Sequence, residues 1–417
     1  MSEPHHPRRM GGRDPHQEHR VATSLELLFD LTFATSFSLA ASQFAHALAA
    51  GHAVAAILGF SYTTFAICWA WINFSWFSSA YDTDDWIFRV VTMVQMIGVL
   101  ILATGLPRMF ASIEHGEHID NSVMVLGYVV MRLALVLQWL RAATQDPARR
   151  RACLTYATAI AVAQIGWVAQ LALGLPTAAT LVVSGVLLII ELLGPVLGER
   201  KDGGTPWHAH HIVERHALFA TIALGEGIVG TVAALSALVA RKGWTTDAAL
   251  VGVAGTALTF GTWWTYYLLP SAPILHTYRH RAFVWGFGQI AIVTSIVATG
   301  AGLHVAAYYV SQEARVSLLA TALSVALPVG VFLVLTYALY YYLARRWGRL
   351  DSWLLIVSIA VVGVAIVMAA NGFSLPGCLL VLALAPAVTI VGYETLGYRR
   401  ESGGIRSSSL GGTGLHN

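Results

Sequence analysis

The residues best suited to carry chemistry are acidic side chains inside apolar stretches. Glu26 and Asp30 lie four positions apart in the sequence SLELLFDLTF, so they share one face of a helix. Two carboxylates in apolar surroundings hold protons more readily than in water, which suggests a proton or cation site. The alternative is that Ser24 caps this helix and the acids interact with the positive end of its dipole.

A later apolar stretch carries a second acidic position. Glu214 and Arg215 lie at its start, and Glu226 lies between two glycines about 20 Å further along a helix that rises 1.5 Å per residue. A charged group deep in a bilayer costs at least a few kcal/mol. Glu226 is therefore expected either to bind a proton or cation or to satisfy an internal hydrogen bond.

Arg132 is a basic residue within another apolar stretch. It is a natural counter-ion for Asp30 or Glu226, and the sequence does not decide between them. Glu191 lies near the end of its stretch and is given less weight, because it could snorkel to the membrane surface.

Two further groups have two interpretations each. Asp82, Asp84 and Asp85 could together bind a cation, or one of the last two could cap the next helix. Aromatic residues gather at two places and could form an interfacial belt or line a substrate cavity. They include Trp69 and Trp71 in one stretch and Trp263 and Trp264 in another.

The weakest candidate is a metal site at His211, Glu214 and His216, because imidazole and carboxylate groups at short spacing can ligate zinc or iron. No second ligand cluster accompanies them, and no phosphate loop, nucleophile elbow or HExxH motif occurs. We therefore predict no catalytic residue and no cofactor, although the metal-dependent enzyme remains an alternative.

The elements that position these residues follow from the composition. The chain has 417 residues, of which 56% are hydrophobic and 11% charged, whereas about a quarter of residues are charged in soluble domains. Apolar runs long enough to cross a bilayer repeat along the chain. The sequence thus predicts an all-α integral membrane protein of about twelve transmembrane helices, at residues 24–48, 53–79, 87–107, 122–143, 152–173, 178–198, 213–240, 247–269, 282–303, 316–343, 351–371 and 376–397.

The basic residues predict an orientation. Of the 25 Lys and Arg residues, Arg132 lies in a span and only Arg108, Arg241, Lys242 and Arg315 fall in connections assigned to the outside when the N-terminus is inside. This bias predicts cytoplasmic termini in a plasma membrane. The net charge of +3 and the short basic clusters do not indicate nucleic-acid binding.

The two halves of the chain, 22–200 and 210–400, share weak similarity. Trp69 and Trp71, followed by Gln95, correspond to Trp263 and Trp264, followed by Gln289. Six helices per half would give a parallel internal repeat. The polar ends, 1–21 and 401–417, are expected to be disordered and cytoplasmic.

Three segments together resemble the bacterial low temperature requirement protein A (LtrA) family. They are LELLFDLTF at 25–33, the Trp-rich span followed by YDTDD at 81–85, and HIVERHALFATIALGE at 211–226. The family has an aromatic residue where His216 stands, and it often has an acid after the paired Trp where Leu268 stands. The resemblance implies that these residues lie at family motif positions: Glu26, Asp30, Asp82, Asp84, Asp85, Arg132, His211, Glu214, Arg215 and Glu226.

The buried acids and the scarcity of extramembrane sequence favour a transporter or an ion- or proton-conducting protein. The family name records a cold-growth phenotype and implies no known activity, so a structural, stress-adaptation protein is the main alternative. The expected partners are the lipid bilayer and an ion or small solute whose identity, like the oligomeric state, the sequence leaves open.

Overall fold

The computed structural model of the chain describes residues 7–397, except 16, 18, 19, 117, 269 and 270. Within these residues the chain is helical and forms no β-strand, apart from an isolated bridge between His118 and Pro176. The predicted all-α class is confirmed. The C-terminal segment 401–417, expected to be disordered, lies outside the described residues.

Eleven helices of the described chain are long and apolar enough to cross a membrane. A twelfth long helix, α9 (Thr246–Tyr267), occupies the predicted eighth span but is less apolar, because glycine, threonine, tryptophan and tyrosine make up much of it. The eleven include α1 (Ser24–Ala49), α2 (Ala53–Tyr81), α3 (Trp86–Thr104), α5 (Ser122–Gln145), α6 (Arg150–Leu173), α7 (Thr177–Gly198), α8 (Ala209–Lys242), α11 (Ala282–Ser311), α12 (Leu318–Ala344), α13 (Arg349–Ala370) and α14 (Leu375–Gly392).

Aliphatic side chains cover the outward faces of these helices. Leu137 on α5, Ile165 on α6 and Val182 on α7 are each more than half exposed. Water would disfavour such faces, whereas lipid accepts them. The chain is therefore a multi-pass helical membrane protein.

The chain folds into two compact units, one formed by 1–226 with 271–297 and the other by 227–270 with 298–417. Helices α8 and α11 each contribute residues to both units. The units do not coincide with the predicted halves, 22–200 and 210–400, so the internal repeat stays a prediction.

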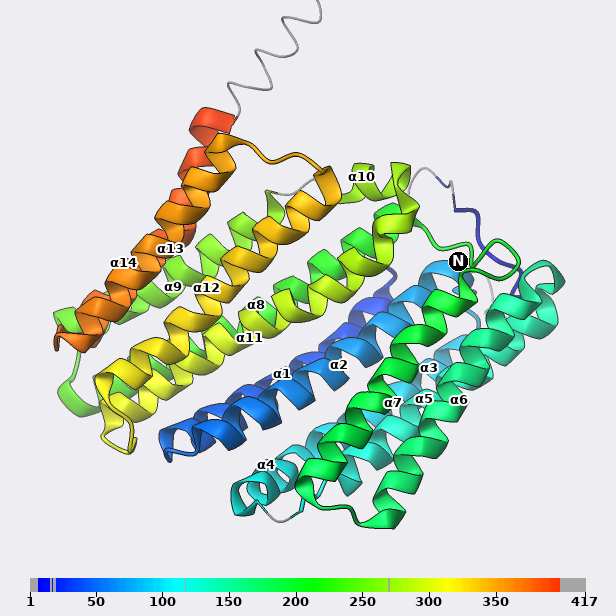
Figure 1. Cartoon of the computed structure of the whole chain (residues 1–417), viewed down its shortest axis with the longest axis horizontal. Helices are drawn as coiled ribbons and strands as arrows, with labels where there is room; N and C mark the ends of the chain where they lie inside the picture. Colours follow the sequence, from blue (N-terminus) through cyan, green and yellow to red (C-terminus); the bar gives the residue numbers. More distant parts are fainter. Residues whose placement is uncertain (1–6, 16, 18–19, 117, 269–270, 398–417) are drawn as a thin grey trace, which may run out of the picture. The chain divides into compact units, whose positions relative to one another are not determined.

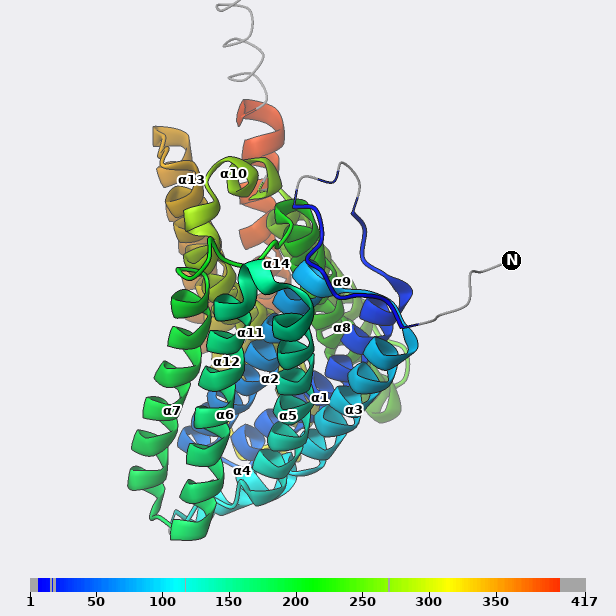
Figure 2. The same cartoon turned by 90° about the vertical axis from the view of Figure 1, so that its right-hand side faces the viewer.

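In the first unit, α2 is the core helix. Every residue from Ile67 to Tyr81 is buried, as expected for a helix that is apolar on all faces. Helix α1 packs along α2 and α3, and α3, α5, α6 and α7 pack successively (Figures 1 and 2). The short helices α4 (Leu106–His115) and α10 (Ser271–Thr277) also belong to this unit.

In the second unit, α14 packs against α9 and α13, and α12 packs against α13. Two of the polar contacts between these helices join neutral hydroxyl groups. The Tyr337 hydroxyl lies 3.2 Å from the Thr389 hydroxyl, which also lies 3.2 Å from that of Ser358. This unit therefore buries hydroxyl groups where the first unit buries charges.

Within 1–21, where disorder is predicted, the described residues contact the end of α2. The amide of Arg13 donates to the Ala80 carbonyl at 3.0 Å, and the Arg20 guanidinium donates to the carbonyls of Ser78, at 2.6 Å, and Ser79. The last carbonyls of a helix lack partners within the helix, and the described residues of this segment supply donors to those of α2.

The start of α1 also differs from the expectation that Ser24 caps it. Thr23 is the N-cap, and Glu26 completes a capping box: the Thr23 amide donates to the Glu26 carboxylate at 2.8 Å, and the Glu26 amide donates to the Thr23 hydroxyl at 3.2 Å. The capping box fixes Glu26 at the point where α1 begins.

Candidate functional site

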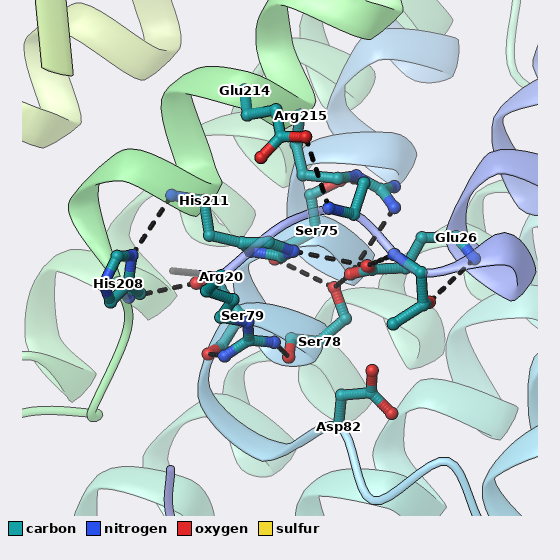
Figure 3. A network of polar contacts seen from close by, with 12 residues as sticks. Arg20, Glu26, Ser75, Ser78, Ser79, Asp82, His208, His211, Glu214 and Arg215 are labelled. Carbon is teal, nitrogen blue, oxygen red and sulfur yellow. Dashed lines mark hydrogen bonds and ion pairs between the residues drawn. The ribbon is translucent and has the colours of Figure 1, made fainter. Parts of the chain in front are cut away.

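Arg215 joins the two acids of α1 in the interior of the first unit. Its Nη2 lies 2.7 Å from Asp30 Oδ1, and its Nη1 lies 3.4 Å from Glu26 Oε1. All three side chains are fully buried. The i, i+4 spacing on α1 places both carboxylates where one guanidinium on α8 can reach them. Figure 3 shows Arg215 beside Glu26.

Glu26 has further partners on two other elements. The Ser78 hydroxyl donates to Glu26 Oε1 at 2.6 Å, and His211 Nε2 lies 3.2 Å from Glu26 Oε2. His211 lies four residues before Arg215 on α8, so both face α1. Together with the Thr23 amide, these contacts occupy both oxygens of Glu26.

Asp30 is less completely satisfied. Its Oδ1 accepts hydrogen bonds from Arg215 and from Trp71 Nε1, the latter at 2.6 Å, while its Oδ2 has no hydrogen-bond partner. The Trp71 ring stacks on Phe219 with centroids 4.0 Å apart. Asp30 therefore keeps one buried oxygen that could accept a proton or a cation.

We call Glu26, Asp30, His211 and Arg215 the buried cluster. It contains two carboxylates and one guanidinium, so with a neutral imidazole its own groups sum to one negative charge, and Glu26 also attracts the buried Arg20 guanidinium of the N-terminal segment. An uncompensated charge in a low-dielectric interior is costly. Binding one proton or one monovalent cation would neutralise the cluster, which is the chemistry this arrangement can perform.

The structure pairs Arg132 with Glu191, neither with Asp30 nor with Glu226. The two side chains are buried, and Arg132 Nη2 donates to Glu191 Oε2. Glu191, weighted less on sequence grounds because it could snorkel, instead points from α7 inward at α5 and α6. Four neutral donors complete its shell: Trp69 Nε1 at 2.6 Å, Trp167 Nε1 at 3.0 Å, Gln164 Nε2 at 3.2 Å and the Tyr128 hydroxyl.

Two other predicted acids lie outside the buried cluster. Glu214 is half-buried and accepts a hydrogen bond from the Ala22 amide at 3.4 Å, because it points toward the N-terminal segment. Glu226 is buried three turns further along α8 beside Ser38, and its Oε2 has no hydrogen-bond partner. Among the proposed ion-site residues Glu26, Asp30, Arg132, Glu214, Arg215 and Glu226, the structure thus brings Arg215 into contact with Glu26 and Asp30.

The three acids after α2 diverge and do not form one cation site. Asp85 caps α3 through the Phe88 amide at 2.8 Å and pairs with Arg141. Burial raises its pKa, but these hydrogen bonds outweigh burial and bring the pKa to about 2. Asp84 pairs with Arg89 at 2.8 Å.

The two predicted tryptophan pairs lie in different surroundings. Trp71 hydrogen-bonds to Asp30 of the buried cluster, and Trp69 hydrogen-bonds to Glu191. Trp263 belongs to the second unit and is 38% exposed, and Trp264 of that unit donates to Glu394 at 3.2 Å. The first pair therefore contacts the two charged sites of the first unit.

The predicted metal-ligand set does not assemble. His211 contacts Glu26, Glu214 faces Ala22, and the His216 Nδ1 lies 2.8 Å from the Ile212 carbonyl. Positions 211 and 216 point to different sides of a helix with 3.6 residues per turn. Among the residues that the structure describes, no three His, Cys, Asp or Glu side chains are grouped to hold a metal ion.

The sequence did not predict Ser78 as part of the site, and it predicted His211 as a metal ligand and not as a partner of Glu26. The serines at 75, 78 and 79, in an otherwise apolar run, were the available signal for the hydroxyl face of α2. Arg215 Nη2 also lies 3.2 Å from the Ser75 hydroxyl.

No solved structure matches the chain. An uncharacterized protein of Rhizobium meliloti is 25% identical over 226 residues, and the match covers 52% of each chain. The chain thus spans about half the length of this curated relative. The sequence pattern described as bacterial low temperature requirement A protein (LtrA) matches residues 21–386, and the chain therefore belongs to the LtrA family.

Proposed function

We propose that this LtrA-family protein conducts protons or cations across the plasma membrane, as a transporter or channel, and that the buried cluster binds the transported ion. The observation that carries the proposal is the excess negative charge of Glu26, Asp30 and Arg215 within membrane-spanning helices. Ionisable groups at such depth are expensive to bury, and they commonly mark ion pathways.

The contacts favour Asp30 as the binding group. Glu26 uses both oxygens for Arg215, His211, Ser78 and the capping box. Asp30 retains the free Oδ2. A proton or cation can bind there without breaking an existing hydrogen bond.

Glu226 extends the proposed pathway along α8. Twelve positions separate it from Glu214 at the same helix's start, a rise of about 18 Å. With both termini in the cytoplasm, as the arginine distribution predicts, ions would pass from Glu26 and Asp30 near the inner face to Glu226 deeper in the membrane.

A proteoliposome assay tests the proposal. Full-length protein is reconstituted, a pH or potassium gradient is imposed, and flux is followed with a dye inside the vesicles. We expect flux in wild type, its loss in Asp30→Asn, and near wild-type flux in Asp84→Asn, which alters an exposed ion pair. Wild-type vesicles that show no flux with protons, sodium or potassium would refute the proposal.

The second candidate is a structural protein whose buried charges hold helices together. The Arg132–Glu191 pair favours it, because five donors saturate the Glu191 carboxylate. The variant Asp30→Asn distinguishes the two candidate functions, because they predict different effects on flux and on stability. A structural role predicts lower stability with no change in flux, and adaptation to cold would then follow from membrane packing.

A further inference from the structure

Asp82 is a buried acid that the cluster does not use. It follows the last residue of α2, and its side chain is 1% exposed. The Asp84 amide donates to its Oδ1 at 2.8 Å, and its Oδ2 has no hydrogen-bond partner. Asp82 therefore resembles Asp30 in keeping one free carboxylate oxygen inside the protein.

A cavity of about 410 Å³ lies against Asp82. The cavity is lined by residues 8–13 of the N-terminal segment and by residues 81–84, which lie at the end of α2 and in the following turn. The lining carries arginine and aspartate side chains and has room for several water molecules. Asp82 thus lines this cavity, and its carboxylate is buried at the edge of it.

Ser78 lies one turn of α2 before Asp82 and contacts the buried cluster. The Asp82 amide donates to the Ser78 carbonyl at 3.1 Å. The Ser78 hydroxyl in turn donates to Glu26 at 2.6 Å. Figure 3 shows Asp82, Ser78 and Glu26 along this end of α2, with Arg215 beyond Glu26.

The charged groups around Asp82 come from three elements, the N-terminal segment, α1 and α3, where Arg89 attracts it. Arg13 Nη1 on the N-terminal segment lies 4.0 Å from its Oδ2, and Arg20 of the same segment also attracts it. Glu26 on α1 repels it. Burial and the repulsion by Glu26 outweigh the arginines and raise the pKa of Asp82 to about 6, so that it changes protonation near neutral pH.

We propose that Asp82 is the residue through which protons enter the buried cluster, with the cavity between residues 8–13 and 81–84 as the entry vestibule. This inference rests on the proposed function and assigns the proton as the transported ion. A proton from cavity water adds to Asp82 Oδ2. Asp82 releases it through a bridging water to the Ser78 oxygen as Ser78 passes its own hydroxyl proton to Glu26. Glu26 passes the proton on to the free Oδ2 of Asp30, one turn along α1, so no bond other than O–H changes.

The test compares Asp82→Asn with Asp84→Asn in proteoliposomes at several pH values. Both variants remove a carboxylate from the same cavity lining, but only Asp82 is buried with one oxygen that lacks a hydrogen-bond partner, whereas the side chain of Asp84 is exposed and bonded to Arg89. We expect the proton flux of Asp82→Asn to fall by about tenfold or more, as for loss of a proton-transfer group. Asp84→Asn should behave as wild type, and Asp82→Glu should recover flux.

A second measurement does not depend on transport. Wild type and variants in detergent are titrated between about pH 5 and pH 7 with a pH indicator, and proton uptake is counted. We expect Asp82→Asn to take up about one proton fewer per chain than wild type, and Asp84→Asn to match wild type. Size-exclusion chromatography and circular dichroism confirm that each variant is folded.

The outcomes separate this inference from the proposed function. If Asp30→Asn abolishes flux while Asp82→Asn retains the wild-type rate and pH profile, the entry role is wrong and the proposed function stands. If wild type shows no flux, the proposed function fails. In that case equal proton uptake by wild type and Asp82→Asn overturns the assignment of Asp82 as a proton acceptor as well.

Discussion

The Arg132–Glu191 pair allows a prediction whose size follows from the contacts. Removal of one partner of a buried ion pair costs about 3–5 kcal/mol of folding free energy, because the other charge stays buried. In Arg132→Met, Glu191 keeps four neutral donors, so we expect a cost near 3 kcal/mol. In Glu191→Gln, Arg132 keeps its charge without a counter-ion, and its Nε and Nη1 already lack partners, so we expect a cost near 5 kcal/mol.

The double variant Arg132→Met/Glu191→Gln removes both charges and should cost less than the sum of the single variants, by roughly 2–3 kcal/mol. The measurement is unfolding of the purified protein in mixed micelles by added sodium dodecyl sulfate, followed by circular dichroism. The exposed Asp84–Arg89 pair is the control, and its disruption should cost under about 1 kcal/mol. Additive costs, or a cost for Arg132→Met as small as the control, would refute the reasoning.

Three further outcomes are expected in the same unfolding assay. The pKa of Asp85 is about 2 because hydrogen bonds from Arg141 outweigh burial, so its carboxylate stabilises the fold above about pH 4. Asp85→Asn should therefore lower the free energy of unfolding at pH 7. The difference in stability between wild type and this variant should shrink as the pH falls toward about 2. Burial raises the pKa of Asp82 to about 6, so the stability of wild type should fall as the pH rises from about 4 to about 6. Above that range Asp82→Asn should be more stable than wild type, by roughly 2–3 kcal/mol. A side chain at Gly127 would overlap the backbone of Leu102 where α5 crosses α3, so Gly127→Val should destabilise by about 1–3 kcal/mol; a neutral effect would mean that the two helices can separate.

The sequence by itself determined the fold class and most helix bounds. Runs of apolar residues specify membrane helices because the length and the hydropathy of a segment decide whether it can span a bilayer, and both are local properties of the chain. The LELLFDLTF and HIVERHALFATIALGE segments also identified the family, which the match over 21–386 confirms. The spacing of Glu26 and Asp30 correctly placed two carboxylates on one helix face, because that depends only on helical periodicity.

Pairing between helices required the tertiary structure. Arg132 could have met Asp30, Glu226 or Glu191, and the choice depended on α7 packing beside α6 so that Glu191 points inward. The hydropathy of a helix does not show how the helix is rotated about its axis. A helix that is apolar on every face gives no signal of which side faces its neighbours.

The same reason separates the two views of the functional site. From the sequence, Glu26 and Asp30 were a pair of acids that needed a partner, and Arg215 was one basic residue near a helix start. The structure decided that a single buried guanidinium serves both carboxylates, and that Ser78 leads from Glu26 toward Asp82. Local periodicity fixes which residues share a face, whereas only packing fixes which faces meet.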